Sequence, residues 1–414
     1  MARVILHCDA NSFYASVELV YRPWLRNMPV AVSGDPEARH GIILTANIIA
    51  KKKYGIKTGE VIWQAKQKCP SLVCLSPDYP KYIRFSKKMR AILEQYSDRV
   101  ESFGLDECWV DISGPNMDFA EGERIANEIR ERIKNELGIT VSIGVADNKV
   151  LAKLGSDVKK PDAVTVLSPE TFREAAWPLP VSNLLYVGPA TTQKLCRMNV
   201  HTIGELANCE TALLKAKLGK NGLMLQMFAL GADPSPVMPI GIEAAIKSVG
   251  HSITPQHDIK TMMHARCIFY LLAESVASRL MENGFKASCI SINVRNTALE
   301  TWQCQCTLPE PSNLCSEIAG AALKLFESRF ASKLPLRSVG IQSSRLSCDA
   351  PLQMDLFGNQ EKRCKEADAA RAIEGLRKRF GHNIIQRGIV LTDPLYAQLS
   401  PKEDHTIHPV SYTH

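Results

Sequence analysis

The segment Arg99-Val-Glu-Ser-Phe-Gly-Leu-Asp-Glu-Cys-Trp-Val-Asp-Ile112 sets two adjacent acids, Asp106 and Glu107, between two apolar runs. These runs predict two buried strands that meet at the acids. An arbitrary Asp-Glu pair usually lies in a solvated turn, and such a turn rarely needs buried strands on both sides. Successive side chains of a strand point to opposite faces, so both acids can face one side only where the chain twists. Gly104 makes that twist easy.

A third acid, Asp9, ends the apolar run Val4-Ile5-Leu6, which gives a second strand followed by an acid. Three carboxylates at two strand ends predict a metal site. Phosphoryl and nucleotidyl transfer use two divalent ions about 3.5–4 Å apart, which hold the attacking and leaving oxygens. Because Mg²⁺ prefers a few carboxylates completed by substrate phosphates and water, we expect a magnesium site that a triphosphate completes.

Composition predicts a folded protein of several domains. The chain has 414 residues, of which 45% are hydrophobic and 22% charged, and this excludes disorder for most of its length. No run approaches the roughly 18 apolar residues of a membrane span, and the N-terminus does not resemble a signal peptide, so we expect a cytoplasmic protein without a membrane partner. The 13 cysteines are expected to be reduced thiols, and their spacing predicts no structural zinc.

The net charge of +7 is unevenly distributed, with an excess of basic residues between 246 and 348. Such a segment suits a nucleic-acid backbone, although a solvated basic face explains the charge equally well.

Up to residue 168 the patterns alternate between strands and helices. A helix over 12–23 is expected to be capped by Asn11 or Ser12, and a helix over 121–137 carries isoleucines at four-residue spacing. After residue 177 the pattern becomes helical, and 184–195 resembles a helix-hairpin-helix, whose glycine turn points backbone amides at a phosphate. Two glycines are usual in that turn, whereas here Tyr186 takes the first position and leaves Gly188 alone.

Residues 233–239 predict an extended linker, and the chain beyond them predicts a separate α+β domain followed by a charged helix over 362–380. The fold class is therefore α+β and multidomain.

Taken together, the motifs resemble the Y-family DNA polymerases of the bacterial polymerase IV kind. The motifs are Asp9-Ala-Asn-Ser-Phe-Tyr-Ala-Ser-Val-Glu18, Thr45-Ala-Asn47, Gly104-Leu-Asp-Glu107, Ser142-Ile-Gly-Val-Ala-Asp-Asn-Lys149 and Lys160-Pro161. The resemblance implies a right-hand polymerase with short fingers and a helical thumb. The implied domains are a palm of residues 1–10 and 78–168, fingers of 11–77, a thumb of 169–232 with the helix-hairpin-helix, a linker of 233–245, a little finger of 246–348 and a tail of 349–414.

The resemblance also implies that Asp9, Asp106 and Glu107 bind two Mg²⁺ ions, with the backbone carbonyl of Ala10 as a further ligand. The ions would lower the pKa of the primer 3′-hydroxyl and neutralise charge on the α-phosphate. The family usually has a second acid two residues after the first. This chain has Asn11 there, which we interpret as a structural residue.

Tyr14 lies at the family's sugar-discriminating position, where an aromatic ring below C2′ leaves no room for a 2′-hydroxyl. Without the motif, a core aromatic on an amphipathic helix would be the better interpretation. Phe13 is expected to pack beside the same sugar, while Gly41 and Ile42 lie where the family's fingers cover the nascent base pair, implying an open pocket.

Thr45, Lys51 and Lys160 are candidates for binding the triphosphate. The family commonly has Tyr and Arg where this chain has Ile48 and Lys51. Ile48 cannot make the hydrogen bond that a tyrosine hydroxyl would make to the triphosphate. Lys51 offers a single ammonium charge in place of the two hydrogen bonds of an arginine. Residues 51–53 are all lysines and equally suit a solvated helix face.

In the tail, Gln353-Met-Asp-Leu-Phe357 resembles the peptide by which bacterial polymerases bind the sliding clamp, with Gln353 at its start and Leu356 and Phe357 as hydrophobic anchors. The family's peptide usually lies at the extreme C-terminus, and here a predicted helix follows it.

The resemblance implies a DNA-directed DNA polymerase for translesion synthesis and DNA repair, a low-fidelity mutator without proofreading. It would act as a monomer on primer-template DNA and deoxynucleoside triphosphates, together with the sliding clamp. Two alternatives stay open: a catalytically weak DNA-binding scaffold, and a palm-type nucleotidyl cyclase, which would need neither the thumb, nor the basic domain, nor the clamp peptide.

Overall fold

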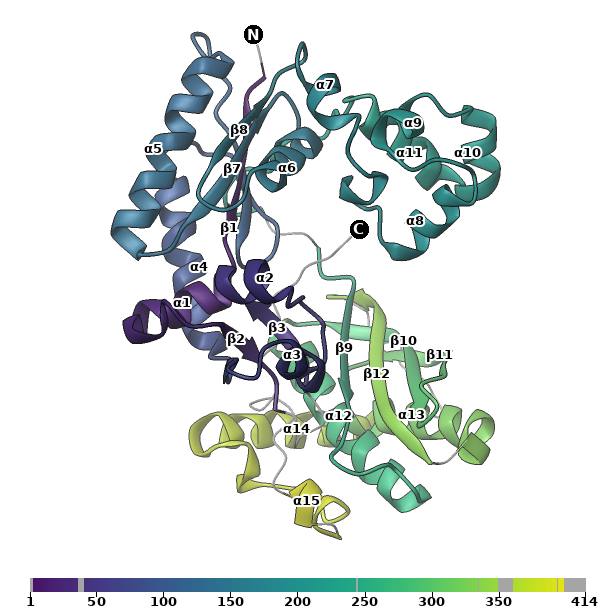
Figure 1. Cartoon of the computed structure of the whole chain (residues 1–414). Helices are drawn as coiled ribbons and strands as arrows, with labels where there is room; N and C mark the ends of the chain where they lie inside the picture. Colours follow the sequence, from purple (N-terminus) through teal and green to yellow (C-terminus); the bar gives the residue numbers. More distant parts are fainter. Residues whose placement is uncertain are drawn as a thin grey trace. The chain divides into compact units, whose positions relative to one another are not determined.

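The computed structural model describes residues 3–35, 41–242, 245–333, 335–348, 360–392 and 394–397. The chain divides into two compact units at residues 244 and 245, and Figure 1 traces both. No helix of the described part is both long and apolar enough to cross a membrane.

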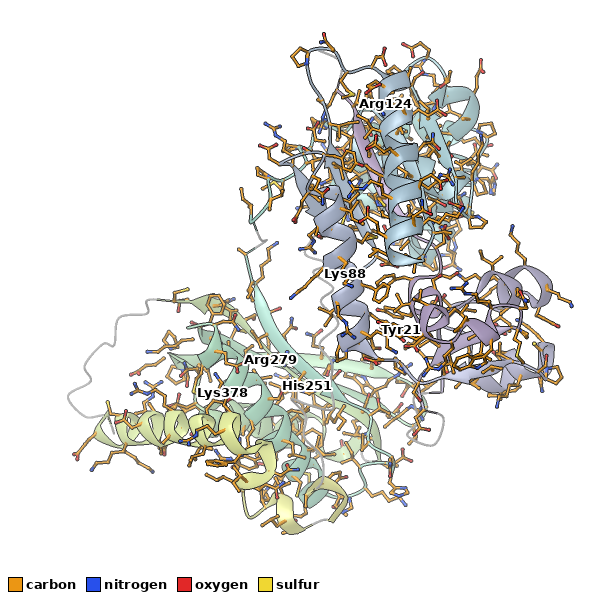
Figure 2. The ribbon with its side chains drawn as sticks, turned by 90° about the vertical axis from the view of Figure 1, so that its left-hand side faces the viewer. Tyr21, Lys88, Arg124, His251, Arg279 and Lys378 are labelled. Carbon is orange, nitrogen blue, oxygen red and sulfur yellow. The ribbon has the colours of Figure 1, made fainter. Side chains whose placement is uncertain are left out.

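The N-terminal unit is built on a five-stranded sheet of order β5-β6-β1-β7-β8, antiparallel except for the parallel pair β7–β8 (Figure 1). Its strands are β1 (Ile5–Ala10), β5 (Val100–Ser102), β6 (Glu107–Asp111), β7 (Val141–Ala146) and β8 (Val164–Leu167). Helices α4 (Tyr79–Leu93) and α5 (Phe119–Leu137) share an apolar core with one face of this sheet. Figure 2 shows Lys88 and Arg124 on these two helices.

The other face of the sheet carries helix α6 (Lys149–Val158), which lies unusually close to β7. A Cβ on Gly144 would lie only 1.9 Å from the carbonyl oxygen of Ala152 and 2.5 Å from the amide nitrogen of Ser156. The helix backbone therefore rests directly on the strand, without an intervening layer of side chains. This contact fixes the distance between α6 and the strands that carry the acids.

Residues 13–75 supply a smaller three-stranded sheet of order β3-β2-β4 with its own core. Its elements are β2 (Val30–Ser33), β3 (Ile43–Ala46), β4 (Val73–Leu75), α1 (Phe13–Tyr21), η1 (Pro23–Leu25), α2 (Ile48–Tyr54) and α3 (Ile62–Lys68). Asn47 caps α2 by accepting a hydrogen bond from the Ala50 amide, and Gly55 ends the helix with φ +64°.

Ser12 stands at the N-cap position of the first helix, as predicted, but its side chain does not cap the helix. Ser12 has φ +50° and makes no capping hydrogen bond, and α1 begins at Phe13. Asn11 instead ties the chain together, because its side chain donates to Ser142 Oγ at 3.0 Å and accepts from the Asp162 amide at 2.9 Å.

Residues 172–229 form a helical segment, as the sequence predicts. Its elements are α7 (Phe172–Ala176), η2 (Val181–Asn183), α8 (Pro189–Cys196), α9 (Ile203–Ala207), α10 (Thr211–Leu218) and α11 (Lys220–Ala229). In the turn before α8, Tyr186 has φ +68°, whereas Gly188 has φ −79°. Tyr186 thus adopts the left-handed conformation that favours glycine.

The extended chain at 233–240 is held against the N-terminal unit. Arg3 donates to the Asp233 carbonyl at 3.2 Å, Glu101 Oε2 accepts from the Met238 amide at 2.9 Å, and the Ile240 amide donates to the Asp98 carbonyl at 2.9 Å.

The C-terminal unit is an antiparallel sheet of order β11-β10-β12-β9 whose inner face packs on two long helices. Its elements are β9 (Ser248–Ile253), α12 (Met262–Glu282), β10 (Lys286–Asn296), β11 (Thr301–Ser312), α13 (Cys315–Arg329), η3 (Ala331–Lys333), β12 (Leu336–Ser347), α14 (Gln360–Phe380), η4 (His382–Ile384), η5 (Val390–Thr392) and α15 (Pro394–Ala397). His251 and Arg279, labelled in Figure 2, join β9 to α12: His251 Nδ1 lies 2.9 Å from Ser275 Oγ, and Arg279 donates to the Gly250 carbonyl at 2.8 Å.

The predicted charged helix is confirmed as α14. Arg377, on its last turn, donates to Glu274 of α12 at 3.1 Å, and both side chains are more than nine-tenths buried. Arg387 donates to the same carboxylate at 2.9 Å. The helix is therefore part of the C-terminal unit.

We expect Gly144→Ala to lower the free energy of unfolding by about 1–3 kcal/mol, because the added methyl group meets backbone atoms that cannot rotate away. Gly114→Ala is the matched control, since a Cβ there meets nothing within 4 Å, and we expect a change within about 0.5 kcal/mol. Urea denaturation of both variants measures the difference; equal stabilities would show that α6 can shift without cost.

Candidate active site

The register of β1 and β6 brings the three acids together. Asp9 lies directly opposite Glu107, and the Ala10 amide donates to the Asp106 carbonyl at 2.9 Å. Hydrogen-bonded and non-hydrogen-bonded pairs alternate along an antiparallel ladder, so Asp9 and Glu107 form a non-hydrogen-bonded pair, the kind with the closest side chains. Gly104 has φ +88°, which confirms the predicted twist before the acids.

A lysine that the sequence analysis missed lies between these carboxylates. Lys153 Nζ is 3.0 Å from Asp9 Oδ2, 3.0 Å from Glu107 Oε2 and 3.2 Å from Asp157 Oδ2. Lys160 Nζ, a predicted triphosphate contact, lies 2.8 Å from the same oxygen of Asp9. The signal in the sequence was that Lys153 stands among the apolar residues of α6, on the face that packs on the sheet.

Burial and mutual repulsion shape the charge of the acids. Burial raises the pKa of Asp106 to about 7, and the neighbouring carboxylates of Glu107 and Asp9 add to the rise. Burial acts in the same direction on Glu107, but the His7 ring and the Lys153 ammonium outweigh it and lower its pKa. Burial lowers the pKa of Lys153, yet Asp9 and Glu107 raise it well above its usual value, so this lysine stays charged.

His7 lies next to Glu107 in the protein interior. It is the second residue near the acids that the sequence did not lead us to predict. It is fully buried, with Nε2 3.2 Å from Glu107 Oε2 and Nδ1 2.9 Å from Ser156 Oγ, and its ring meets Trp109 edge-on at 5.2 Å. The Nε2 contact is a close approach without hydrogen-bond alignment. His7 precedes Asp9 by two residues in β1, so strand alternation alone could have placed both on one face.

The acids fit a divalent cation, although they do not surround a metal position as they stand. Within the described ranges, no three His, Cys, Asp or Glu side chains form a group that could hold a metal ion. Ammonium groups lie at Asp9 and Glu107 instead. The oxygen donors are of the type that Mg²⁺ prefers. Burial, with the nearby carboxylates of Glu107 and Asp9, raises the pKa of Asp106, and a bound cation would oppose that rise.

Tyr14 is held by neighbouring aromatic rings. It is half-buried on α1 and stacks on Tyr82, with centroids 4.3 Å apart and planes 14° apart. Tyr79 meets it edge-on at 5.9 Å, and the buried Phe13 lies 5.7 Å away. Tyr82 in turn donates to the buried Glu18 at 3.0 Å, so Tyr14 packs against a fixed wall.

Of the three residues predicted to bind the triphosphate, the two lysines lie near Asp9. Lys51 Nζ donates to Ser12 Oγ at 3.0 Å, just after β1, and its pKa is lowered by burial and by Lys160. These two lysines and Asp9 are therefore brought together. Thr45 is buried in β3.

Gly41 and Ile42, predicted to cover the nascent base pair, lie just before β3. Ile42 pairs with Val61 in an isolated bridge and is 43% exposed, while the Gly41 carbonyl accepts from the Ile62 amide at 2.8 Å. Gly188 is the residue before α8 in the helical segment. Gln353, Leu356 and Phe357 lie outside the described residues.

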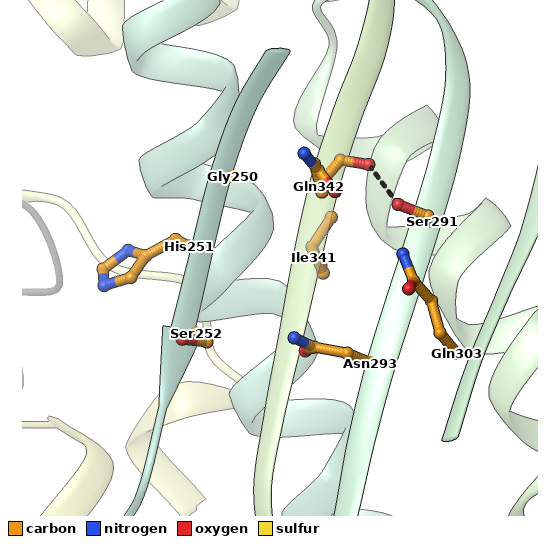
Figure 3. Close-up of a pocket in the computed structure, with 8 residues that line it drawn as sticks. All are labelled: Gly250, His251, Ser252, Ser291, Asn293, Gln303, Ile341 and Gln342. Carbon is orange, nitrogen blue, oxygen red and sulfur yellow. Dashed lines mark hydrogen bonds between the residues drawn. The ribbon is translucent and has the colours of Figure 1, made fainter. Parts of the chain in front are cut away.

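A pocket of about 200 Å³ opens on the sheet of the C-terminal unit (Figure 3). Its lining consists of Gly250, His251, Ser252, Ser291, Asn293, Gln303, Ile341 and Gln342. Ser291 donates to the Gln342 carbonyl at 3.3 Å across the strands, as the dashed line in Figure 3 marks. This pocket has polar side chains but no carboxylate, so it does not offer the chemistry of the acid cluster.

Comparisons with known proteins place the chain in a family. A model described as the impB/mucB/samB family matches residues 8–157, and one for the C-terminal domain of that family matches 246–356. A protein of Acetivibrio thermocellus named DNA polymerase IV is 48% identical over 394 residues, covering 95% of this chain and 98% of the relative. DNA polymerase IV 1 of Bacillus subtilis is 38% identical over 392 residues, covering 94% of each chain.

Among solved structures, a Y-family DNA polymerase chimera superposes with a TM-score of 0.74 at 21% identity, covering 84% of this chain and all of the other, and this likeness bears on the fold. The chain belongs to the impB/mucB/samB family of Y-family DNA polymerases.

Proposed function

We propose that this translesion DNA polymerase adds deoxynucleotides to a primer 3′-hydroxyl at the cluster of Asp9, Asp106 and Glu107. The supporting observation is the strand register that sets Asp9 opposite Glu107, with Asp106 one residue away. These three carboxylates and the Ala10 carbonyl would hold two Mg²⁺ ions. When bound, the ions would lower the pKa of the hydroxyl and neutralise charge on the α-phosphate.

In this proposal the remaining residues of the site orient the incoming nucleotide. Lys160 and Lys51 supply point charges to the triphosphate oxygens, and Thr45 supplies a hydroxyl. Ile48 offers no hydrogen bond, so we expect nucleotide affinity to rest mainly on the two lysines. The stacked Tyr14 forms a wall below C2′ and excludes a 2′-hydroxyl, with Phe13 packing beside the same sugar.

We further propose that base pairing and the Tyr14 wall provide most of the fidelity. Gly41 and Ile42 would cover the nascent base pair with little more than the aliphatic side chain of Ile42, leaving room for damaged templates. Residues 1–10 and 78–168 would act as palm, 11–77 as fingers, 169–232 as thumb with Gly188 at a DNA phosphate, 233–245 as linker, and 246–348 as little finger.

The tail would bind the sliding clamp through Gln353, Leu356 and Phe357. We propose that the polymerase acts as a monomer in the cytoplasm and gains its contact time on DNA from the clamp.

We expect Asp106→Ala to lower the rate of primer extension at least about 100-fold while leaving primer-template affinity unchanged, because the carboxylate acts in the chemical step. Single-turnover extension and fluorescence anisotropy measure the two quantities. Glu123→Ala, which removes an exposed carboxylate on α5, is the control and should behave as wild type. Extension by Asp106→Ala at the wild-type rate would refute the mechanism.

Tyr14→Ala should reduce the preference for deoxyribonucleotides over ribonucleotides at least about tenfold, because the wall below C2′ is removed. Tyr14→Phe keeps the ring and should keep the preference, which separates sterics from the hydroxyl. The ratio of kcat/KM for the two nucleotides is the measurement, and an unchanged ratio in the alanine variant would exclude Tyr14 as the gate.

Replacing Leu356 and Phe357 together by alanine should abolish stimulation by the bacterial sliding clamp and leave clamp-free synthesis intact, since the two anchors contribute only to the groove contact. Product length on a primed circular template, with and without clamp, provides the test. Persistent stimulation would mean that another segment binds the clamp.

A further inference from the structure

The ammonium of Lys153 lies where two of the proposed metal ligands meet. It is 3.0 Å from an oxygen of Asp9 and 3.0 Å from an oxygen of Glu107, and the side chain is only 14% exposed. A third carboxylate, Asp157, lies 3.2 Å from the same nitrogen. The lysine therefore bridges two facing acids with one positive charge and has a third carboxylate within reach.

Asp157 differs from the other two acids in its position. It follows Lys153 by four residues on α6, so both lie on the same side of that helix, and it is 39% exposed. It also lies 2.7 Å from Lys160 Nζ. An ammonium that left Asp9 and Glu107 could thus remain paired without crossing an apolar region.

We propose that Lys153 is a displaceable counter-ion that keeps Asp9 and Glu107 facing each other before metal binds and then withdraws to Asp157. This inference rests on the proposed function, because it takes Asp9 and Glu107 as metal ligands. Lys153 is a positioning residue in this role: it acts through the carboxylates and contacts no substrate.

The arrangement suits a lysine. Lysine carries a compact ammonium group on a flexible stem, which can move from one carboxylate to another. An arginine would bind a carboxylate through two hydrogen bonds at once and would have to break both to move. The backbone of α6 is fixed on β7 through the contact at Gly144, so only the side chain has to move. Lysine and divalent cation then compete for the same oxygens, and each weakens the binding of the other by the same factor.

The test is Mn²⁺ binding to the full chain, without DNA or nucleotide, with free Mn²⁺ measured by electron paramagnetic resonance. Lys153→Met should bind Mn²⁺ about tenfold more tightly than wild type, a factor typical of coupled sites. Its Tm without metal should fall, because the two acids lose their counter-ion. Lys159→Met removes the same charge from the exposed end of α6 and should leave both quantities unchanged.

A double-mutant cycle separates displacement from general electrostatics. Asp157→Asn should weaken Mn²⁺ binding in the wild-type background, because Lys153 loses the partner that receives it. The same change should have a smaller effect in the Lys153→Met background. Equal effects in both backgrounds would overturn the withdrawal to Asp157.

An affinity of Lys153→Met equal to or weaker than that of wild type would overturn the inference while leaving the metal site standing. Equal Mn²⁺ binding by wild type and Asp9→Asn would remove the metal site and the inference together.

If Lys153→Met does not fold, Lys153→Arg provides the second measurement. The guanidinium fork of the arginine should hold the acids more firmly and weaken Mn²⁺ binding. Wild-type affinity in that variant would refute the competition between side chain and metal.

Discussion

The antiparallel ladder between β1 and β6 is the constraint on which the site depends. A shift of one residue would send Asp9 to the opposite face from Glu107, because side chains alternate along each strand. The register is secured by the apolar residues of the same strands: Leu6 and Cys8 face the core shared with α4 and α5, whereas Ile5 packs in the core on the other side. The burial that stabilises the sheet therefore also aligns the acids.

A second constraint sets the depth of the site. Helix α6 rests on β7 backbone to backbone at Gly144, and this close approach brings Lys153 to the acids and Ser156 to His7. A larger residue in the strand would separate the charged groups from their partners. The sheet thus provides the carboxylates of Asp9 and Glu107, and helix α6 provides the ammonium of Lys153. Their spacing depends on Gly144, which has no side chain to hold the helix away from the strand.

Sequence reasoning predicted the acids because each follows an apolar run, a pattern visible without knowledge of the fold. It predicted the long helix α5 because 19 residues give room for several turns of periodicity. It missed the strands β4 and β8, which have three and four residues. It also missed Lys153 and His7, because their roles arise from contacts with residues far away in the chain.

Ser12 stands at the predicted N-cap position but forms no capping hydrogen bond, for a related reason. A local preference of Asn and Ser for helix starts was overridden by tertiary contacts, in which Asn11 bonds to Ser142 and Asp162. By contrast, Tyr186 adopts the backbone conformation suited to glycine, in agreement with its place at a position of the predicted turn where glycine is usual. The roles that the family implies for individual residues remain predictions, whereas the fold around the acids is described directly.

The stacking of Tyr14 on Tyr82 has a thermodynamic consequence. A side chain that is free before the nucleotide arrives must lose conformational entropy on binding, and that loss weakens affinity. The Tyr14 ring is already immobilised by Tyr82 and Tyr79, and Tyr82 is itself anchored to Glu18. In the role proposed for Tyr14, the ring is therefore preorganised, and selection of the sugar would need no ordering of the protein at the moment of binding.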